Sequence, residues 1–209
     1  MFPRTPSGSG PDGYSRLVKV PIVLASASPR RLELLRRVGL SPDVRPTSTD
    51  ESLREGEDPF DAAERLARAK AEAALPGVAP GTLVVAADTL VVLDGKALGK
   101  PRDRDDARAM LRALSGRTHG VVTGVALARD GRVVSGRDVT EVVFAPLSDA
   151  GIEAYVATGE PDDKAGAYAL QGIGGLFVER IDGTPSNVVG LPVRLVALLA
   201  HRLGVDLLG

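Results

Sequence analysis

The chain has 209 residues, with 26 Lys and Arg against 27 Asp and Glu, so its formal net charge is −1. This length and a hydrophobic fraction of 44% are typical of one or two globular domains with an ordinary buried core. The absence of cysteine excludes disulfides, zinc–thiolate centres, iron–sulfur clusters and thiol nucleophiles. The near-neutral charge argues against a dedicated nucleic-acid-binding protein, and no apolar run approaches the roughly 18 residues of a membrane span.

The first 17 residues are rich in Pro, Gly and Ser and lack apolar periodicity. This composition predicts a disordered tail over 1–17, followed by a single folded domain over 18–209. No apolar segment of a secretory signal follows Arg4. Together with the lack of cysteine, this favours a cytoplasmic location.

Apolar patterns and turn residues predict strands mixed with helices. In chain order we expect a strand (18–25), helices (29–38 and 58–75), a strand (83–87, with 90–93 continuing it or pairing with it), a helix (103–114), two antiparallel strands (120–128 and 132–144), a helix (148–158), a strand (176–181) and a helix (192–203). Ser28 and Ser148 are expected to cap the helices that follow them. This order predicts one α/β or α+β domain on a mixed sheet and leaves open whether it has two lobes.

Four segments place polar groups at the expected ends of elements. The first is Ser26-Ala27-Ser28-Pro29-Arg30-Arg31. Backbone N–H groups at a helix start favour an anion, and arginines in the first turn suit bidentate contacts with a polyphosphate. A solvated helix end with surface arginines explains this segment equally well when it is taken alone.

Two of the segments are acidic. Thr49-Asp50-Glu51 follows an irregular stretch, and a solvated loop is the simpler interpretation. In Ala86-Ala87-Asp88-Thr89, a carboxylate emerges from an apolar strand beside a hydroxyl. A lone Asp there is more often a turn residue or cap. However, carboxylate oxygens are also the ligands of Mg²⁺. This ion keeps several of its waters, so one or two carboxylates are enough to bind it.

The fourth segment is the glycine-rich stretch 159–175, which contains the only glutamine of the chain, Gln171. Its amide offers a donor and an acceptor to a nucleobase edge, and a flexible surface loop is the alternative. Lys100 can serve as a point charge for phosphate or be an ordinary loop lysine. His119 is expected to be structural and His201 to be exposed.

Taken together, these segments favour metal-assisted attack on a nucleotide polyphosphate. The chain lacks a Gly-x-Ser-x-Gly elbow, a Walker A sequence and a Gly-x-Gly-x-x-Gly turn, which argues against serine hydrolases, P-loop proteins and Rossmann proteins. Lysine and amide residues are scarce, with five Lys, one Gln and one Asn, Asn187. Each of these residues is therefore a candidate for a specific role.

The chain resembles the Maf family of nucleoside triphosphate pyrophosphatases from Pro21 to Leu203. The motifs that carry the resemblance are Leu24-Ala25-Ser26-Ala27-Ser28-Pro29-Arg30-Arg31 with Glu33-Leu34-Leu35, Arg65-Leu66-Ala67-Arg68-Ala69-Lys70, Ala87-Asp88-Thr89, Gly99-Lys100-Pro101, Leu114-Ser115-Gly116-Arg117-Thr118-His119, and Asp163-Lys164-Ala165-Gly166-Ala167-Tyr168 through Gln171-Gly172.

This resemblance implies an elongated, two-lobed α/β fold with a central cleft, similar to the inosine triphosphate pyrophosphatases, and a Maf-like catalytic domain over 18–209. It implies hydrolysis of a nucleoside triphosphate to the monophosphate and pyrophosphate with Mg²⁺ or Mn²⁺, by a homodimer. The lack of Trp favours the branch that acts on dTTP and UTP, and leaves modified pyrimidine nucleotides open. The alternative is a nucleotide-binding regulator of septum formation in cell division, with little turnover.

The resemblance also implies roles for individual residues. The expected catalytic residues are Asp88, Glu51 and Lys100, and Asp88 and Glu51 are also the expected metal ligands. The expected substrate-binding residues are Ser26, Arg30, Arg31, Lys70, Thr89 and Gln171. Of these, Gln171 would pair with the O4/N3 edge of uracil or thymine.

Overall fold

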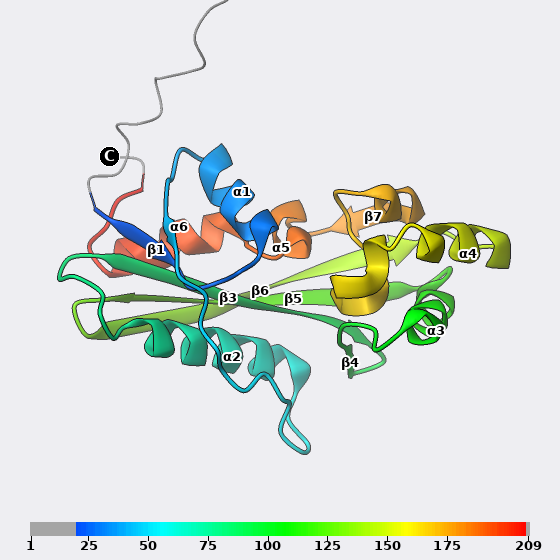
Figure 1. Cartoon of the computed structure of the whole chain (residues 1–209), viewed down its shortest axis with the longest axis horizontal. Helices are drawn as coiled ribbons and strands as arrows, with labels where there is room; N and C mark the ends of the chain where they lie inside the picture. The colour runs from blue at the N-terminus through cyan, green and yellow to red at the C-terminus, as the bar shows by residue number, and fades with distance from the viewer. Residues whose placement is uncertain (1–19, 208–209) are drawn as a thin grey trace, which may run out of the picture.

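The computed structural model describes residues 20–207, so the expected tail over 1–17 lies outside the described residues. The elements are, in chain order, β1 (Ile22–Leu24), α1 (Pro29–Arg37), β2 (Asp43–Val44), α2 (Pro59–Ala74), β3 (Leu83–Leu93), β4 (Lys96–Leu98), α3 (Arg104–Leu114), β5 (Thr118–Arg129), β6 (Arg132–Phe144), α4 (Asp149–Ala157), the 3-10 turns η1 (Glu160–Asp163), η2 (Ala165–Ala167) and η3 (Ile173–Phe177), β7 (Val178–Asp182), α5 (Pro185–Val189) and α6 (Val193–Arg202) (Figure 1).

The strands form one seven-stranded mixed sheet in the order β2-β1-β3-β5-β6-β7, with β4 paired to β3. β1 runs parallel to β2 and β3, and the remaining pairs are antiparallel. The predicted mixed α/β fold is therefore confirmed. Among residues 20–207, no helix is both long and apolar enough to cross a bilayer.

The long strand β3 has one edge that its neighbours cover only in part. Leu83–Val85 pairs with β1, and Val91–Leu93 pairs with β4 on the same edge. The opposite edge is covered by β5 along almost its whole length. Within the described part of the chain, no strand covers residues 86–90 on the first edge, so the sheet is open there near its middle.

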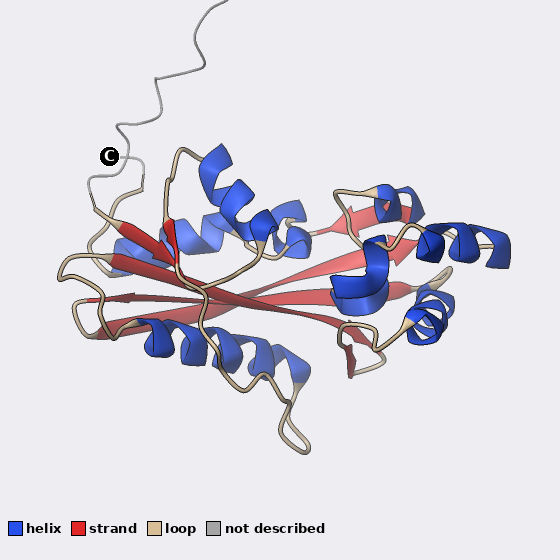
Figure 2. Ribbon diagram, in the orientation of Figure 1, coloured by secondary structure: helices blue, strands red, loops and turns tan. Residues whose placement is uncertain are grey.

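Helices cover both faces of the sheet and divide the molecule into two lobes. α2 lies on one face, and α1, α5 and α6 lie on the other (Figures 1 and 2). One apolar cluster lies under α1 and α6 and includes Leu24 and Leu35. A second cluster, at the opposite end of the sheet, lies under α3 and α4 and includes Leu111 and Phe144. The molecule is elongated because these two cores lie end to end.

Helix α2 packs unusually close to the sheet. Its buried face is made largely of alanine, and on β5 it faces Gly124. A Cβ atom at Gly124 would lie 2.1 Å from the carbonyl oxygen of Ala63, so only glycine allows this approach. Gly124 lies directly across from Asp88 in the sheet. The helix is therefore pressed against the pair of strands that carries Asp88.

Several local expectations need correction. Ser148 caps its helix as predicted, but the side chain of Ser28 makes no capping hydrogen bond. The side chain of Ser26 instead accepts a hydrogen bond from the backbone N–H of Ser28. The predicted strand over 176–181 begins only at Val178, because a 3-10 turn precedes it. The short elements β2 and α5 were not predicted.

Candidate active site

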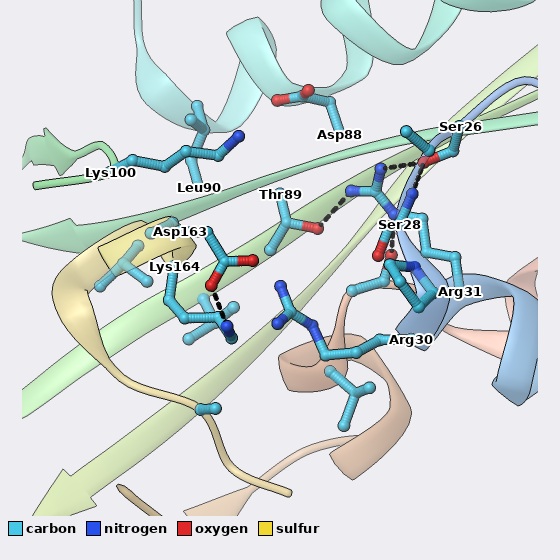
Figure 3. Close-up of a pocket in the computed structure, with 18 of the residues that line it drawn as sticks. Ser26, Ser28, Arg30, Arg31, Asp88, Thr89, Leu90, Lys100, Asp163 and Lys164 are labelled. Carbon is cyan, nitrogen blue, oxygen red and sulfur yellow. Dashed lines mark hydrogen bonds and ion pairs between the residues drawn. The ribbon is translucent and has the colours of Figure 1, made fainter. Parts of the chain in front are cut away.

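A cleft of about 580 Å³ opens at the uncovered edge of β3, between the two lobes. All nine predicted site residues line it: Ser26, Arg30, Arg31, Glu51, Lys70, Asp88, Thr89, Lys100 and Gln171. The structure thus brings together residues from α1, α2, β3 and four loops (Figure 3). Concave sites between lobes are where small molecules usually bind.

A buried ammonium group joins the two predicted carboxylates. Nζ of Lys70 donates to Oδ1 of Asp88 at 2.5 Å and lies 2.5 Å from Oε1 of Glu51. Lys70 and Asp88 are buried, whereas the side chain of Glu51 is 57% exposed. The hydrogen bond from Lys70 is the main cause of a lowered pKa of Glu51, and desolvation opposes it. The structure places Lys70 as the bridge between two acids, and its contact with substrate stays a prediction.

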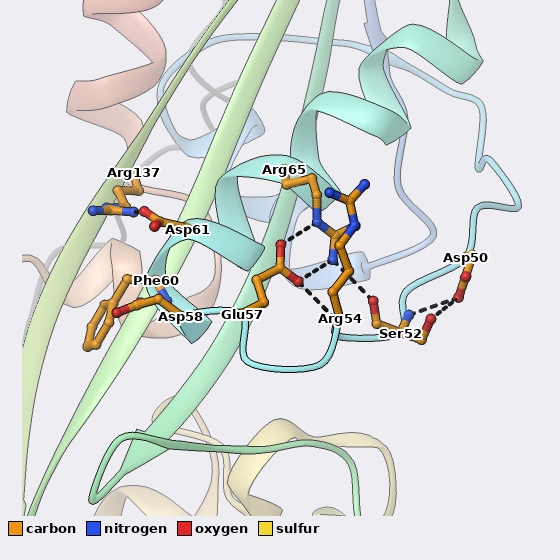
Figure 4. Close-up of polar contacts among 9 residues, drawn as sticks. All are labelled: Asp50, Ser52, Arg54, Glu57, Asp58, Phe60, Asp61, Arg65 and Arg137. Atoms are coloured by element: carbon orange, nitrogen blue, oxygen red, sulfur yellow. Dashed lines mark hydrogen bonds and ion pairs between the residues drawn. The ribbon is translucent and has the colours of Figure 1, made fainter.

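The loop that carries Glu51 is anchored to α2 (Figure 4). Arg65, on the same helix as Lys70, donates to both carboxylate oxygens of Glu57 at 2.5 and 2.7 Å and to the carbonyl oxygen of Ser52 at 3.1 Å. The hydrogen bonds that Glu57 accepts from Arg65 and from the backbone N–H of Arg54 lower its pKa to about 2. Glu51 and Lys70 therefore belong to one connected unit, which the sequence alone did not reveal.

On the other face of β3, Arg31 is tied to the protein by every nitrogen of its guanidinium group. Nε donates to the carbonyl oxygen of Gly190 at 2.8 Å, and the terminal nitrogens donate to the hydroxyls of Ser26 and Thr89 at 3.0 and 3.1 Å. Burial lowers the pKa of Arg31, although two nearby carboxylates oppose this. By contrast, the side chain of Arg30 makes no hydrogen bond with the described residues, and Figure 3 shows it extending into the cleft. Arg30 is thus the arginine that is free to contact a ligand.

A chain of buried hydrogen bonds continues behind Arg31. The hydroxyl of Thr89 lies 3.0 Å from that of Thr123, which donates to the carbonyl oxygen of Asn187 at 2.9 Å. The amide of Asn187 donates to the carbonyl oxygen of Val121 at 2.8 Å and to the hydroxyl of Thr140 at 3.0 Å. This network lies between the two apolar clusters. No role for Asn187 was predicted, although its being the only asparagine was the signal.

The far side of the cleft is made by loops of the second lobe. Lys100 is exposed, yet its charge lies close enough to lower the pKa of Glu51 further. Asp163 and Lys164 form an ion pair at the rim, and Gln171 is exposed nearby. His119, expected to be structural, is buried against Tyr168 with its Nε2 2.9 Å from the Tyr168 hydroxyl.

The donor set fits a hard divalent cation. In the described part of the chain, no group of three or more His, Asp and Glu residues could hold a metal ion. Asp88 and Glu51 provide oxygen ligands only, and both lie at 2.5 Å from the same ammonium nitrogen. Mg²⁺ and Mn²⁺ prefer oxygen ligands, and Mg²⁺ completes its shell with water and substrate phosphate. Two carboxylates so close together therefore fit such an ion.

Paired carboxylates facing several cations in a cleft are typical of enzymes that act on phosphorylated small molecules. The comparison with protein families identifies the family: the pattern described as Maf-like protein matches residues 21–203. The chain therefore belongs to the Maf-like protein family.

Two curated proteins are similar to this chain over most of its length. The dTTP/UTP pyrophosphatase of Anaeromyxobacter dehalogenans strain 2CP-1 is 55% identical over 190 residues, which are 89% of this chain and 95% of the relative. The dTTP/UTP pyrophosphatase of Chromobacterium violaceum is 50% identical over 190 residues, covering 89% of this chain and 96% of the relative. The solved structure of the Staphylococcus aureus Ham1 protein is 17% identical, with a TM-score of 0.42 over 88% of this chain and 92% of the other.

Proposed function

We propose that this chain is a nucleoside triphosphate pyrophosphatase that hydrolyses dTTP and UTP to the monophosphate and pyrophosphate. The relatives above carry that name over nearly the same length of chain. The observation that carries the proposal is the Asp88–Lys70–Glu51 bridge at the open edge of β3. It places two acids beside the start of α1 and Arg30, where a polyphosphate would lie.

In this proposal the triphosphate lies along the cleft. Backbone N–H groups at the start of α1, together with Arg30 and Lys100, bind its negative charge. Arg31 orients the wall of the site, since its own nitrogens are all used. The base lies toward Gln171, whose side chain would bind the edge of uracil or thymine.

Asp88 and Glu51 are the residues that would hold Mg²⁺ or Mn²⁺. When bound, such an ion supplies Lewis-acid polarisation of a phosphoryl oxygen. Lys70 occupies Oδ1 of Asp88, which leaves Oδ2 to orient a water molecule and accept its proton. The water oxygen forms a bond to the α-phosphorus, and the bond from that phosphorus to the bridging oxygen breaks. Arg30 and Lys100 stabilise the charge that moves onto the leaving pyrophosphate.

The direct test is pyrophosphate release from a panel of nucleoside triphosphates with Mg²⁺, with Mn²⁺ and with chelator. We expect dTTP and UTP to be the preferred substrates. Asp88→Asn should lower kcat by a factor of roughly 10² to 10³, as for loss of one transition-state contact. Asp43→Asn, on the exposed strand β2, is the matched control. Full activity of the Asp88 variant would contradict the proposal, and tight dTTP binding without turnover would favour the regulatory alternative.

The remaining expectations belong to the same proposal. A homodimer and a single catalytic domain over 18–209 follow from the family resemblance. A cytoplasmic location follows from the lack of cysteine and from a nucleotide substrate. Light scattering of the purified protein tests the assembly.

A further inference from the structure

Glu160, outside the group of predicted site residues, holds the loop that carries Gln171. Its carboxylate accepts hydrogen bonds from the backbone N–H groups of Ile173 and Gly174, at 2.9 and 3.0 Å. It also accepts a hydrogen bond from the hydroxyl of Tyr155 at 2.9 Å. Desolvation raises the pKa of Glu160, but these three donors outweigh it and the pKa is lowered. The carboxylate is therefore ionised at neutral pH, and its negative charge strengthens the hydrogen bonds that hold the backbone of Ile173 and Gly174.

The second half of this clamp is anchored in the core. Tyr155 lies on α4 and is only 2% exposed, and its ring packs edge-on against Phe177 at 4.9 Å. Its hydroxyl also accepts a hydrogen bond from the backbone N–H of Ala169, at 3.3 Å. The loop is thus tied to Tyr155 on one side of Gln171 and to Glu160 on the other.

Two glycines of this loop are explained by the clamp. A Cβ atom at Gly172 would lie 2.3 Å from Oε2 of Glu160, and one at Gly174 would lie 2.7 Å from the hydroxyl oxygen of Tyr155. Side chains at these positions would push the loop away from its two anchors. The repeated glycines therefore allow the backbone to lie directly against the clamp and do not indicate a loose segment.

Gln171 needs such a support. Among the residues that the structure describes, no partner holds its side chain, so its direction follows from the backbone on which it stands. A rotated amide exchanges its donor and acceptor. Cytosine presents a donor where thymine and uracil present an acceptor. Gln171 can therefore distinguish cytosine from uracil or thymine only if two conditions hold. Its backbone must be fixed relative to the base, and the neighbouring peptide groups, which cannot rotate, must also contact the base.

We propose that Glu160, together with Tyr155, is a positioning residue for base selection, which it achieves by fixing the loop that presents Gln171 to the nucleotide. This inference rests on the proposed pyrophosphatase function and adds to it. Glu160 does not touch the reacting phosphates. Its removal should therefore alter the choice of base more than the rate of hydrolysis of the preferred substrate.

The test compares kcat/KM for UTP with kcat/KM for CTP. Glu160→Gln keeps the shape but leaves only one acceptor oxygen, and its amide nitrogen faces a backbone N–H. We expect the UTP/CTP ratio to fall roughly tenfold, corresponding to the loss of one positioned hydrogen bond. Tyr155→Phe, which keeps the ring and removes only the hydroxyl, should shift the ratio in the same direction and replaces the first variant if that one does not fold. The control, Glu179→Gln, removes an exposed carboxylate from β7 and should leave the ratio unchanged.

A double-mutant cycle distinguishes positioning from general loosening of the fold. In a Gln171→Ala background, Glu160→Gln should have little further effect on the ratio, because the group that it positions is gone. Equal losses for UTP and CTP, or full additivity with Gln171→Ala, would overturn the proposal. UTP hydrolysis by the unaltered chain is measured first. Its failure would refute the proposed function, whereas an unchanged ratio in an active enzyme refutes only the role of Glu160.

Discussion

Lys70 illustrates how one side chain can set the chemistry of a site. The residue is only 7% exposed, and its ammonium group lies 2.5 Å from each of two carboxylates. Desolvation makes a buried charge costly unless it is paired, and here it is paired twice. In return, the hydrogen bond from the ammonium group stabilises the ionised form of Glu51 and lowers its pKa.

The pH dependence of activity should therefore depend on Lys70. The lowered pKa of Glu51 predicts that this carboxylate stays ionised, and the enzyme active, below the ordinary glutamate pKa of 4.5. Without Lys70, the hydrogen bond that lowers the pKa of Glu51 is lost and this pKa rises, so Lys70→Met should lose activity at a higher pH as the solution is acidified. The measurement is kcat/KM from about pH 4 to pH 8. Lys96→Met, at the exposed first residue of β4, is the control. If Lys70→Met lowers the rate but activity falls at the same acidic pH as in the unaltered chain, this account is contradicted.

At the scale of elements, hydrogen bonds connect the strand β3 to the short helix α5, which lies far from it in the sequence. Asp88 and Thr89 are neighbours on β3, yet they face α2 and α1 on opposite sides of the sheet. The hydroxyl of Thr89 contacts that of Thr123, which in turn donates to the carbonyl oxygen of Asn187 on α5. Asn187 is fully buried. The residue after α5, Gly190, receives the hydrogen bond from Arg31.

Asn187→Ala should destabilise the fold. It leaves the carbonyl oxygen of Val121 and the hydroxyl of Thr140 without the amide donor, so we expect the free energy of unfolding to fall by about 2–4 kcal/mol. Urea denaturation measures this change. The matched control is the neighbouring Ser186→Ala, since the buried Ser186 hydroxyl has no partner among the described residues. An equal effect of the two variants would show that the amide contacts contribute little.

Local signals succeeded for long elements and failed for short ones. The helix α2 and the hairpin of β5 and β6 were predicted because apolar periodicity persists over many residues. The elements β2 and α5, with two and five residues, are too short to show a period. Ser28 has the right residue type for a cap, but its neighbour Ser26 accepts the hydrogen bond from the Ser28 backbone instead.

At the scale of the whole molecule, two apolar clusters lie at opposite ends of one sheet, and the cleft opens between them at β3. The second core contains His119, whose ring packs edge-on against Phe144 and Tyr168. Burial lowers the pKa of His119 from 6.5 to about 4. The folded protein therefore keeps this histidine neutral where the unfolded chain would protonate it.

Global stability should accordingly depend on pH. Between pH 6.5 and about 4 the unfolded chain binds a proton that the folded protein does not, so the free energy of unfolding decreases as pH falls. The part due to His119 is about 3 kcal/mol over that range, and it is fully present only above pH 6.5. Denaturation at several pH values should show a flatter dependence for His119→Phe, while His201→Gln, at an exposed site, should behave like the unaltered chain. Identical slopes for all three proteins would exclude this role.

The sequence by itself determined the α/β class, the long helices and strands, and nine of the residues that line the cleft, because each depends on local patterns or on motifs present in the chain. Only the tertiary structure decided that Lys70 bridges Asp88 and Glu51, that Arg31 is held while Arg30 is free, and that Glu160 clamps the loop of Gln171. The physical reason is that these contacts join side chains on different elements. Their distances are set by how helices and loops pack on the sheet, and spacing along the chain does not contain that information.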